Sequence, residues 1–484
     1  MIFTNKNLEP WTGKDYSKTI FQFFAHVVVI TLLFVVAVFL NEGSVENFLA
    51  FFRAPETRMN FIYIILALVF LIAMLYIYFY NEFRDFLKSG RNILMIFVVL
   101  DISIIISYII GKYLHIYARP VSLCALLILL LINRRAAIVL NIAHCMIMFM
   151  IDTFAFGDFG YDKSIYFSMV IGITTGLLAI YLVSNVSSRI KVFIMGFFIS
   201  IPVIVCVLCF EYNPTTSIWH LLGYGFTSGM LSVVLMMAIL PFFEYVFNII
   251  TDYRLSEITD HNSKLIEKLR LEAPGTFNHS LIVSTLAESC ASAIGESPLL
   301  ARAAAYYHDI GKLKQPEYFT ENQSGWNPHN ELSPELSTEI IKAHAKDGYD
   351  LIKKYRLPQI LADVAREHHG TTVIQYFYAK AMRLTDGDLK AEDFSYIGPR
   401  PTSKIAAIIM ICDASEAAVR SAKERDHDKI HTVIGKIIQD RMGSGQFGDC
   451  PLTMKDIEVI HTTITQSLSG VYHNRVSYPK LKNK

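Results

Sequence analysis

A succession of apolar segments fills the first half of the chain and constrains its fold more than any other feature. From about Thr19 to Ile250 the sequence is mainly Ile, Leu, Val, Phe and Met, whereas from about Thr251 to Lys484 it resembles a soluble enzyme in composition. A bilayer core about 30 Å thick needs about 20 apolar residues per helical span. Such segments must be helical, because lipid cannot satisfy backbone hydrogen bonds. The first half is therefore predicted to be a polytopic helical membrane domain.

We predict eight spans in residues 1–250. They cover about 18–40, 59–80, 92–112, 118–133, 135–153, 164–184, 191–211 and 218–249. Only Asn133, Arg134 and Arg135 separate the fourth span from the fifth. The first span is too long for a signal-peptide core and lacks a clear cleavage site, so it is interpreted as an anchor.

Lysine and arginine residues indicate the orientation of these spans. An even number of spans places both ends on one side of the membrane. The basic residues on that side are Lys6, Lys14, Lys18, Arg84, Lys88, Arg91, Arg134, Arg135, Arg189, Lys191 and Arg254. Those on the other side are Arg53, Arg58, Lys112, Arg119 and Lys163. This bias of roughly two to one predicts that the C-terminal half is cytoplasmic.

Four polar groups lie within the predicted spans: Asp101, Asn141, His144 and Glu244. Ionisable groups in a membrane span are functional candidates by default. We favour hydrogen bonds between helices or interfacial positions, because no repeated charged stripe marks an ion path. A transporter with a regulatory soluble domain is an alternative that these few residues support poorly.

An apolar stripe continues beyond the last span, through residues 251–272. Leu255, Ile258, Leu265, Ile266 and Leu269 recur at helical spacing. Two interpretations stay open: a helical stalk that provides a homodimer contact, and a plain amphipathic linker.

The overall charge and the cysteines exclude some classes of protein. The net charge of +1 gives no bulk electrostatic case for a DNA or RNA polymer as partner. The chain has seven cysteines, and four of them lie inside apolar runs, which is not a disulfide framework. The soluble half holds only Cys290, Cys412 and Cys450, as expected in a reducing cytoplasm.

Residues 273–484 are predicted to form an all-helical domain that carries a cluster of metal-ligating side chains. Ser297-Pro298 and Ser333-Pro334 are typical helix starts, and Gly370 stands where a helix should stop. The candidate metal ligands are His279, His308, Asp309, His344, His368, His369 and Asp413. Asp413 ends an apolar run that Ser403 opens, and a carboxylate buried there is costly unless it is paired or binds a cation.

The number and type of these residues indicate two metal ions. One zinc ion needs about three or four ligands. Seven candidates suit two octahedral ions that share a bridging carboxylate. Imidazole and carboxylate ligands without a thiolate favour manganese or iron over a structural zinc site.

Several motifs resemble those of the seven-transmembrane HD family. They are Glu272–Ser280 (EAPGTFNHS), Tyr307–Lys312 (YHDIGK), Asn327–His329 (NPH), Glu367–Thr372 (EHHGTT), Tyr472–Arg475 (YHNR) and, in the membrane half, Pro241–Glu244 (PFFE). The resemblance implies a multi-pass protein of the bacterial cell membrane whose cytoplasmic domain hydrolyses cyclic di-AMP to linear 5′-pApA. Relatives that hydrolyse cyclic di-GMP carry Gly-Tyr-Pro after the paired histidines, where this chain has Gly370-Thr-Thr.

The resemblance also implies a role for each site residue. One metal would be held by His279, His308, Asp309 and Asp413, and the second by His344, His368 and His369, with Asp309 bridging. Lys312, four residues after His308, is expected to face the same pocket and bind phosphate. Weaker candidates for substrate contacts are Asn327, His329, Thr371 and Thr372, which turns and helix ends explain equally well.

One departure from the family concerns the space after the first span. The family usually places a large extracytoplasmic domain there, whereas only about Asn41 to Arg58 fills it here. We therefore expect no conventional external sensing domain at that position. Two alternatives for the soluble half stay open: hydrolysis of another cyclic dinucleotide or nucleotide, and a membrane receptor that binds nucleotide without catalysis.

Overall fold

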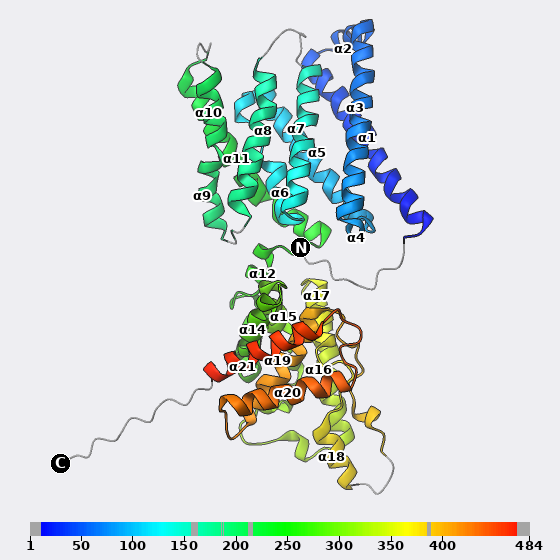
Figure 1. Ribbon diagram of the computed structural model, residues 1–484, viewed down its shortest axis with the longest axis vertical. Helices are drawn as coiled ribbons and strands as arrows, with labels where there is room; N and C mark the ends of the chain where they lie inside the picture. Colours follow the sequence, from blue (N-terminus) through cyan, green and yellow to red (C-terminus); the bar gives the residue numbers. More distant parts are fainter. Residues whose placement is uncertain are drawn as a thin grey trace, which may run out of the picture. The chain divides into compact units, whose positions relative to one another are not determined.

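The structure is a computed structural model that describes residues 11–155, 163–184, 186, 188–211, 216–384 and 389–471. Within these ranges the chain is helical, and an isolated bridge between Val373 and Ser395 is the sole β pairing (Figure 1). The chain divides into two compact units between Tyr253 and Arg254, close to the change in composition at Ile250. The predicted all-helical class is confirmed.

The first unit contains the long apolar helices. Its elements are α1 (Gly13–Glu42), α2 (Val45–Arg53), α3 (Pro55–Glu82), α4 (Arg84–Leu87), α5 (Gly90–Tyr113), η1 (Ile116–Ala118), α6 (Leu123–Leu131), α7 (Arg134–Ala155), α8 (Lys163–Val183), α9 (Arg189–Ile199), α10 (Ile201–Phe210) and α11 (Ile218–Phe247). Among the described residues, seven segments are long and apolar enough to cross a membrane: α1, α3, α5, α7, α8, α9 with α10, and α11. The first half is a multi-pass membrane domain.

The fourth predicted span, 118–133, differs from the expected membrane helix. Only the 9 residues of α6 are α-helical there. Pro120 lacks a backbone N–H and disfavours helical geometry at Arg119. Arg119 is buried and forms a bidentate ion pair with Asp152 on α7, at 2.5 and 2.8 Å. Arg119 is therefore an internal residue of the bundle and not, as the sequence predicts, a loop residue on the side opposite the termini.

Residues 114–133 nevertheless carry the chain from one side of the helix bundle to the other. Lys112 donates a hydrogen bond to the carbonyl of Leu40, so α5 ends beside the end of α1. Arg135 lies 3.2 Å from Glu82, so α7 begins beside the end of α3. Because α1 and α3 run antiparallel (Figure 1), these two ends lie on opposite sides of the bundle. The segment thus makes a crossing in addition to the seven long ones.

Polar side chains in the bundle mostly contact neighbouring helices. Asp101 on α5 lies 3.3 Å from His26 on α1, and Asn141 donates a hydrogen bond of 3.4 Å to a backbone carbonyl of α8. The predicted hydrogen bond between helices is confirmed for Asn141, whereas Asp101 contacts the neighbouring helix without a hydrogen bond to His26. Glu244 accepts a hydrogen bond from the segment after α11. His144 is buried without a hydrogen bond among the described residues.

The second unit is a bundle of shorter helices. After α12 (Asp252–Ile258) come α13 (Lys264–Glu272), α14 (Pro274–Ala293), α15 (Pro298–Tyr307), η2 (Ile310–Lys314), η3 (Pro316–Tyr318), η4 (Thr320–Asn322), η5 (Pro328–Asn330), α16 (Pro334–Lys354), α17 (Gln359–Glu367), α18 (Gln375–Leu384), η6 (Ala391–Phe394), α19 (Lys404–Ser421), α20 (His427–Gly443) and α21 (Met454–Val471). Ser297, Ser333 and Ser403 accept N-cap hydrogen bonds, as expected. Helix α14 packs against α15 and α19, and α16 packs against α17 and η2.

The predicted helical stripe of residues 251–272 is not one continuous helix. Asn248 ends α11 in the left-handed conformation, with φ of 51°, and α12 and α13 are separate helices. Leu265, Ile266 and Leu269 are buried, and α13 packs against α14 in the same chain. These three residues are therefore not available for a dimer contact, and this part of the stalk interpretation is wrong.

Candidate metal centre

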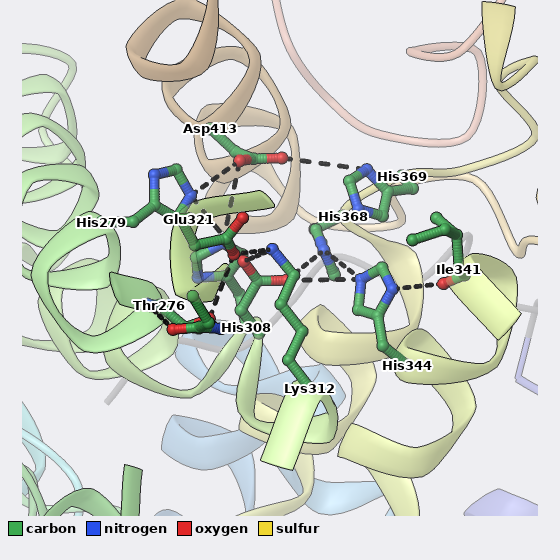
Figure 2. A network of polar contacts seen from close by, with 12 residues as sticks. Thr276, His279, His308, Lys312, Glu321, Ile341, His344, His368, His369 and Asp413 are labelled. Carbon is green, nitrogen blue, oxygen red and sulfur yellow. Dashed lines mark hydrogen bonds and ion pairs between the residues drawn. The ribbon is translucent and has the colours of Figure 1, made fainter. Parts of the chain in front are cut away.

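The seven predicted ligands come together from five helices of the second unit, and all of them except Asp309 are labelled in Figure 2. His279 lies on α14, His344 on α16 and Asp413 on α19, while the pairs 308–309 and 368–369 follow the ends of α15 and α17. They form two groups, each with ligand atoms within 4.8 Å of one another. One group is His279, His308, Asp309 and Asp413, and the other is Asp309, His344, His368 and His369.

Asp309 belongs to both groups and presents a different oxygen to each. Its Oδ2 lies 3.2 Å from Nε2 of His308 and 3.8 Å from Nε2 of His279. Its Oδ1 lies 3.3 Å from Nε2 of His344 and 3.7 Å from Nε2 of His368. A carboxylate in this position is placed to bridge two cations.

Asp413 closes the site from the α19 side. Its Oδ1 lies 3.0 Å from Nε2 of His279, and its Oδ2 lies 3.8 Å from Nδ1 of His369. Asp413 occupies the middle of α19, as expected from the apolar run before it. The carboxylate of Asp413 therefore lies closer to His279 of the first group than to His369 of the second group.

Three of the histidines are oriented by the same backbone interaction. Nδ1 of His308, His344 and His368 lies 2.7, 2.6 and 2.8 Å, respectively, from the carbonyl oxygen three residues earlier. If Nδ1–H donates to this carbonyl, the lone pair of Nε2 points into the cluster. Fixing the tautomer in this way is typical of histidines that ligate metals.

The electrostatics of the site favour the protonation states that metal ligands need at His344 and Asp309, but not at His279. Burial lowers the pKa of His344 to about 4, so its imidazole is neutral at pH 7. Burial alone would raise the pKa of Asp309, but His308 and Lys312 hold it well below its ordinary value. His279 is different: burial lowers its pKa, but hydrogen bonds to Asp413 and Glu416 raise it to about 9.

A close backbone approach brings α16 to the His308-Asp309 pair. A Cβ atom on Gly311 would lie 1.9 Å from the carbonyl oxygen of His344 and 2.5 Å from the amide nitrogen of Gly348. Only glycine fits at position 311, and so η2 packs directly on α16. This contact sets the spacing between Asp309 and His344.

Lys312 points into the cluster, as predicted. Its Nζ lies 2.7 Å from Oδ2 of Asp309 and 2.8 Å from Oε1 of Glu321. Burial would lower the pKa of Lys312, but Asp309 and Glu321 hold it above its ordinary value. Thr276 donates a hydrogen bond of 3.1 Å to the same oxygen of Glu321. The ammonium group of Lys312 thus lies beside the site where the substrate phosphate is expected.

Two acidic residues of the site were missed by the sequence analysis. Glu321 is one, and Glu416 is the other. Glu416 is buried one helical turn after Asp413, and its Oε2 lies 2.5 Å from Nδ1 of His279. The spacing of three residues on α19 was the available signal, because it places both carboxylates on the same helix face.

Asn327 and His329 lie in the turn that contains η5. Oδ1 of Asn327 accepts a hydrogen bond from the amide of His329, and Nε2 of His329 lies 2.9 Å from the carbonyl oxygen of Tyr318. Neither residue belongs to the two groups of candidate ligands. Their predicted substrate contacts stay predictions, as does any role of the Tyr472–Arg475 motif, which lies outside the described residues.

Thr371 and Thr372 organise the turn after the paired histidines. Thr371 exchanges hydrogen bonds with Gln446, and the hydroxyl of Thr372 donates to the carbonyl of His369 at 2.8 Å. The carbonyl of Thr372 accepts from the amide of Tyr396 at 3.0 Å. These bonds fix the turn, and contacts of either threonine with substrate stay predictions.

The donor set fits divalent metal ions. Nε2 of His308 and Oδ1 of Asp309 are buried and have no hydrogen-bond partner among the described residues. Buried polar atoms without partners are costly unless a ligand or ion satisfies them. The two groups offer imidazole nitrogens and carboxylate oxygens but no thiolate. Such ligands suit borderline and hard divalent cations.

The comparisons with known proteins agree with this geometry. The family described as a 7TM receptor with intracellular HD hydrolase matches residues 58–251, and the HD domain matches residues 276–418. The chain belongs to the seven-transmembrane HD family. Its second unit therefore has the fold of a metal-dependent HD hydrolase, and its first unit is the multi-pass membrane part of the family.

Two curated members of the seven-transmembrane HD family are similar to this chain. The cyclic-di-AMP phosphodiesterase PgpH of Bacillus subtilis is 36% identical over 427 residues, which cover 85% of this chain and 59% of the relative. The protein of that name from Listeria monocytogenes is 41% identical over 315 residues, or 64% of this chain and 44% of the relative. The chain thus spans about half the length of these relatives.

The second unit of the chain is also similar in sequence to a solved domain. The crystal structure of the L. monocytogenes PgpH HD domain in complex with cyclic di-AMP has 47% sequence identity and a TM-score of 0.42. The match covers 44% of this chain and 99% of that domain.

Proposed function

We propose that this protein is a membrane-anchored phosphodiesterase that hydrolyses cyclic di-AMP to 5′-pApA and so controls the level of this second messenger. The observation that carries the proposal is the position of Asp309, with one oxygen toward each group of candidate ligands. Both relatives described above are cyclic-di-AMP phosphodiesterases by name, which supports the substrate.

Two divalent ions, Mn²⁺ or Fe²⁺, are the proposed cofactors. The first would be held by His279, His308, Asp309 and Asp413, and the second by Asp309, His344, His368 and His369. When bound, such a pair supplies a water of lowered pKa as nucleophile and neutralises charge on the phosphate.

The residues of the chain prepare the site for this chemistry. Asp309 holds a negative charge between the two groups, and the histidines fixed through Nδ1 present Nε2 without rearrangement. The side-chain ammonium group of Lys312 lies beside the carboxylate of Asp309. A charge-assisted bond from Lys312 to a phosphate oxygen would hold the diester in place and offset the charge that develops as the 3′-oxygen leaves.

We further propose that the organism is a bacterium and that the catalytic unit lies in the cytoplasm. The additional crossing by residues 114–133 gives an even number of crossings, and the basic residues predominate on the side of the termini. Reporter fusions near Lys14 and after Lys484 should both report a cytoplasmic location. An external signal from either fusion would refute this orientation.

A homodimer would use the membrane helices. The burial of Leu265, Ile266 and Leu269 within their own chain argues against a contact through the stalk. Cysteine crosslinking in native membranes at exposed positions of α3, such as Leu66 or Phe70, tests this arrangement. Crosslinks that form through α13 instead would contradict it.

The proposed activity is tested with residues 256–484 expressed alone, since the second unit is compact by itself. We expect a soluble helical protein that converts cyclic di-AMP to 5′-pApA with Mn²⁺ or Fe²⁺ under reducing conditions. A panel with cyclic di-GMP and mononucleotides measures its selectivity. A folded fragment that binds no metal and cleaves none of these substrates would refute the enzyme.

A further inference from the structure

A small cavity lies in the first unit, where the irregular segment before α6 meets α5, α7 and α8. It is bordered by Ser107 on α5, Arg119 on the irregular segment, His144 and Met148 on α7, and Ser168 on α8. His144 is at the middle of α7, which is long and apolar enough to cross a membrane. The cavity therefore brings polar side chains together inside the membrane domain.

His144 has unused hydrogen-bonding capacity at this cavity. Its side chain is 2% exposed, and neither Nδ1 nor Nε2 has a hydrogen-bond partner among the described residues. A neutral imidazole carries one N–H donor and one acceptor lone pair, and each is costly to bury unpaired. The ring is therefore suited to form hydrogen bonds with a ligand in the cavity.

Two other polar groups at the cavity are in the same situation. Oγ of Ser107 and Nε of Arg119 are buried and have no hydrogen-bond partner among the described residues. These two atoms come from α5 and from the irregular segment, whereas His144 comes from α7. Native proteins leave few buried polar groups unpaired. Three such groups from three elements at one cavity indicate a shared partner.

The charges at the cavity favour a neutral partner. The guanidinium of Arg119 is already compensated, because two of its nitrogens bond to the carboxylate of Asp152 at 2.5 and 2.8 Å. Arg119 is the one lysine, arginine or acidic residue in the described lining of the cavity. An ion in the cavity would therefore place a charge without a counter-charge inside the membrane domain, which is costly.

The size of the cavity limits what it can bind. Its volume is about 20 Å³. A water molecule needs at least about 10–15 Å³ of such space and about two to four polar partners. Sites for organic ligands span roughly 300–1,000 Å³. The cavity therefore has room for a single water molecule and not for an organic ligand.

We propose that this cavity binds one water molecule within the membrane domain. The water accepts a hydrogen bond from Nε–H of Arg119 and donates one to the unprotonated ring nitrogen of His144. The hydroxyl of Ser107 pairs with the same water. The water thus links the irregular segment to α5 and α7, next to the buried ion pair of Arg119 and Asp152. This site is independent of the hydrolysis proposed for the second unit.

X-ray footprinting of the full-length protein in detergent tests for the water. Irradiation converts a bound water to a hydroxyl radical that oxidises the side chains beside it, and methionine sulfoxide is a common product. Met148 borders the cavity and is 5% exposed, whereas Met95 on α5 is fully buried and does not border it. We expect Met148 to be oxidised at least about fivefold faster than Met95, because oxidation follows access to the oxidant. Equal rates would overturn the proposal.

Removal of the polar partners distinguishes bound water from solvent that reaches Met148 directly. Ser107→Ala and His144→Leu should each lower the oxidation of Met148 at least about twofold, because a buried water needs about two to four polar partners. The control is Thr174→Ala on α8, since Thr174 is exposed and its hydroxyl donates to the carbonyl of Val170. Oxidation of Met148 that is unchanged in both cavity variants would overturn the water site.

The unfolding temperature of His144→Leu provides a second measurement. If a water pairs with His144, the variant loses a hydrogen bond and should unfold at a temperature about 2–4 °C lower than wild type. If His144 has no partner, removal of a buried unpaired group should leave the unfolding temperature unchanged or raise it. A His144→Leu protein at least as stable as wild type would therefore overturn the proposal.

Discussion

Oε2 of Glu416 lies 2.5 Å from Nδ1 of His279, at the ring nitrogen opposite to the one that faces the cluster. His279 differs from His308, His344 and His368, because its Nδ1 interacts with a carboxylate and not with a backbone carbonyl of its own helix. This carboxylate fixes the ring and increases the basicity of Nε2. Glu416 is therefore expected to position His279 within the first group of candidate ligands.

Glu416→Ala should weaken metal binding at the first group about 10–100-fold, the usual effect of removing such a partner. Affinity for the second metal should change little, because Glu416 acts through His279, which belongs to the first group of candidate ligands and not to the second. Titration with Mn²⁺ resolves the two binding steps. Glu458→Ala, at an exposed position of α21, serves as control. Equal loss at both groups would show that Glu416 acts on the fold instead.

Lys312→Ala should keep both metals and lose turnover. Lysine does not ligate metal at neutral pH, and its bond to phosphate contributes about 1.5–3 kcal/mol, or roughly 10- to 150-fold in kcat/KM. Lys314→Ala on the same 3₁₀ helix is the matched control, because Lys314 is 54% exposed and pairs with Asp347. Loss of metal from the Lys312 variant would assign this lysine to the support of Asp309 and not to substrate.

Metal uptake should depend on pH through His279. Its pKa in the metal-free site is raised to about 9, so at pH 7 a proton occupies a nitrogen that the metal needs. Metal and proton compete, and the affinity of the first group should therefore rise from pH 7 toward pH 9 and level off above it. Calorimetry in buffers of different ionisation enthalpy measures the proton released. Affinity that is constant over this range would contradict the competition.

The buried ion pair of Arg119 and Asp152 should contribute to the stability of the membrane domain. Removal of one partner leaves an uncompensated buried charge, which costs about 3–5 kcal/mol. We expect Arg119→Ala to lower the unfolding temperature of the full-length protein in detergent, and Arg119→Leu with Asp152→Leu to lower it less. Arg58→Ala, at an exposed position, is the control. A single variant as stable as the control would contradict this role.

The sequence was sufficient to identify the candidate ligands that the fold brings together, because their signals are local. His308-Asp309 and His368-His369 are adjacent pairs at helix ends, and Asp413 is an unusual carboxylate in an apolar helix. Glu416 carries the same local signal but becomes informative only when α14 is known to place His279 against α19. That proximity joins residues 137 positions apart and follows from packing alone.

In the membrane half, too, local sequence does not predict contacts that depend on packing. Apolar length predicts the long helices, but the irregular crossing before α6 depends on how Pro120 and the Arg119–Asp152 pair act together. The apolar stripe through Leu265 and Leu269 forms one face of a helix, as its spacing predicts. Its partner proved to be α14 of the same chain, which periodicity cannot distinguish from a second copy.

Asp309→Ala tests the central claim most directly, because a single carboxylate is proposed to serve both ions. Metal content of the folded variant should be measured together with hydrolysis of cyclic di-AMP, beside Asp413→Ala and His368→Ala. We predict that Asp309→Ala loses metal from both groups and has no activity, whereas Asp413→Ala mainly empties the first group and His368→Ala mainly the second. Folded Asp309→Ala protein with two bound metals and near-normal hydrolysis would contradict the account.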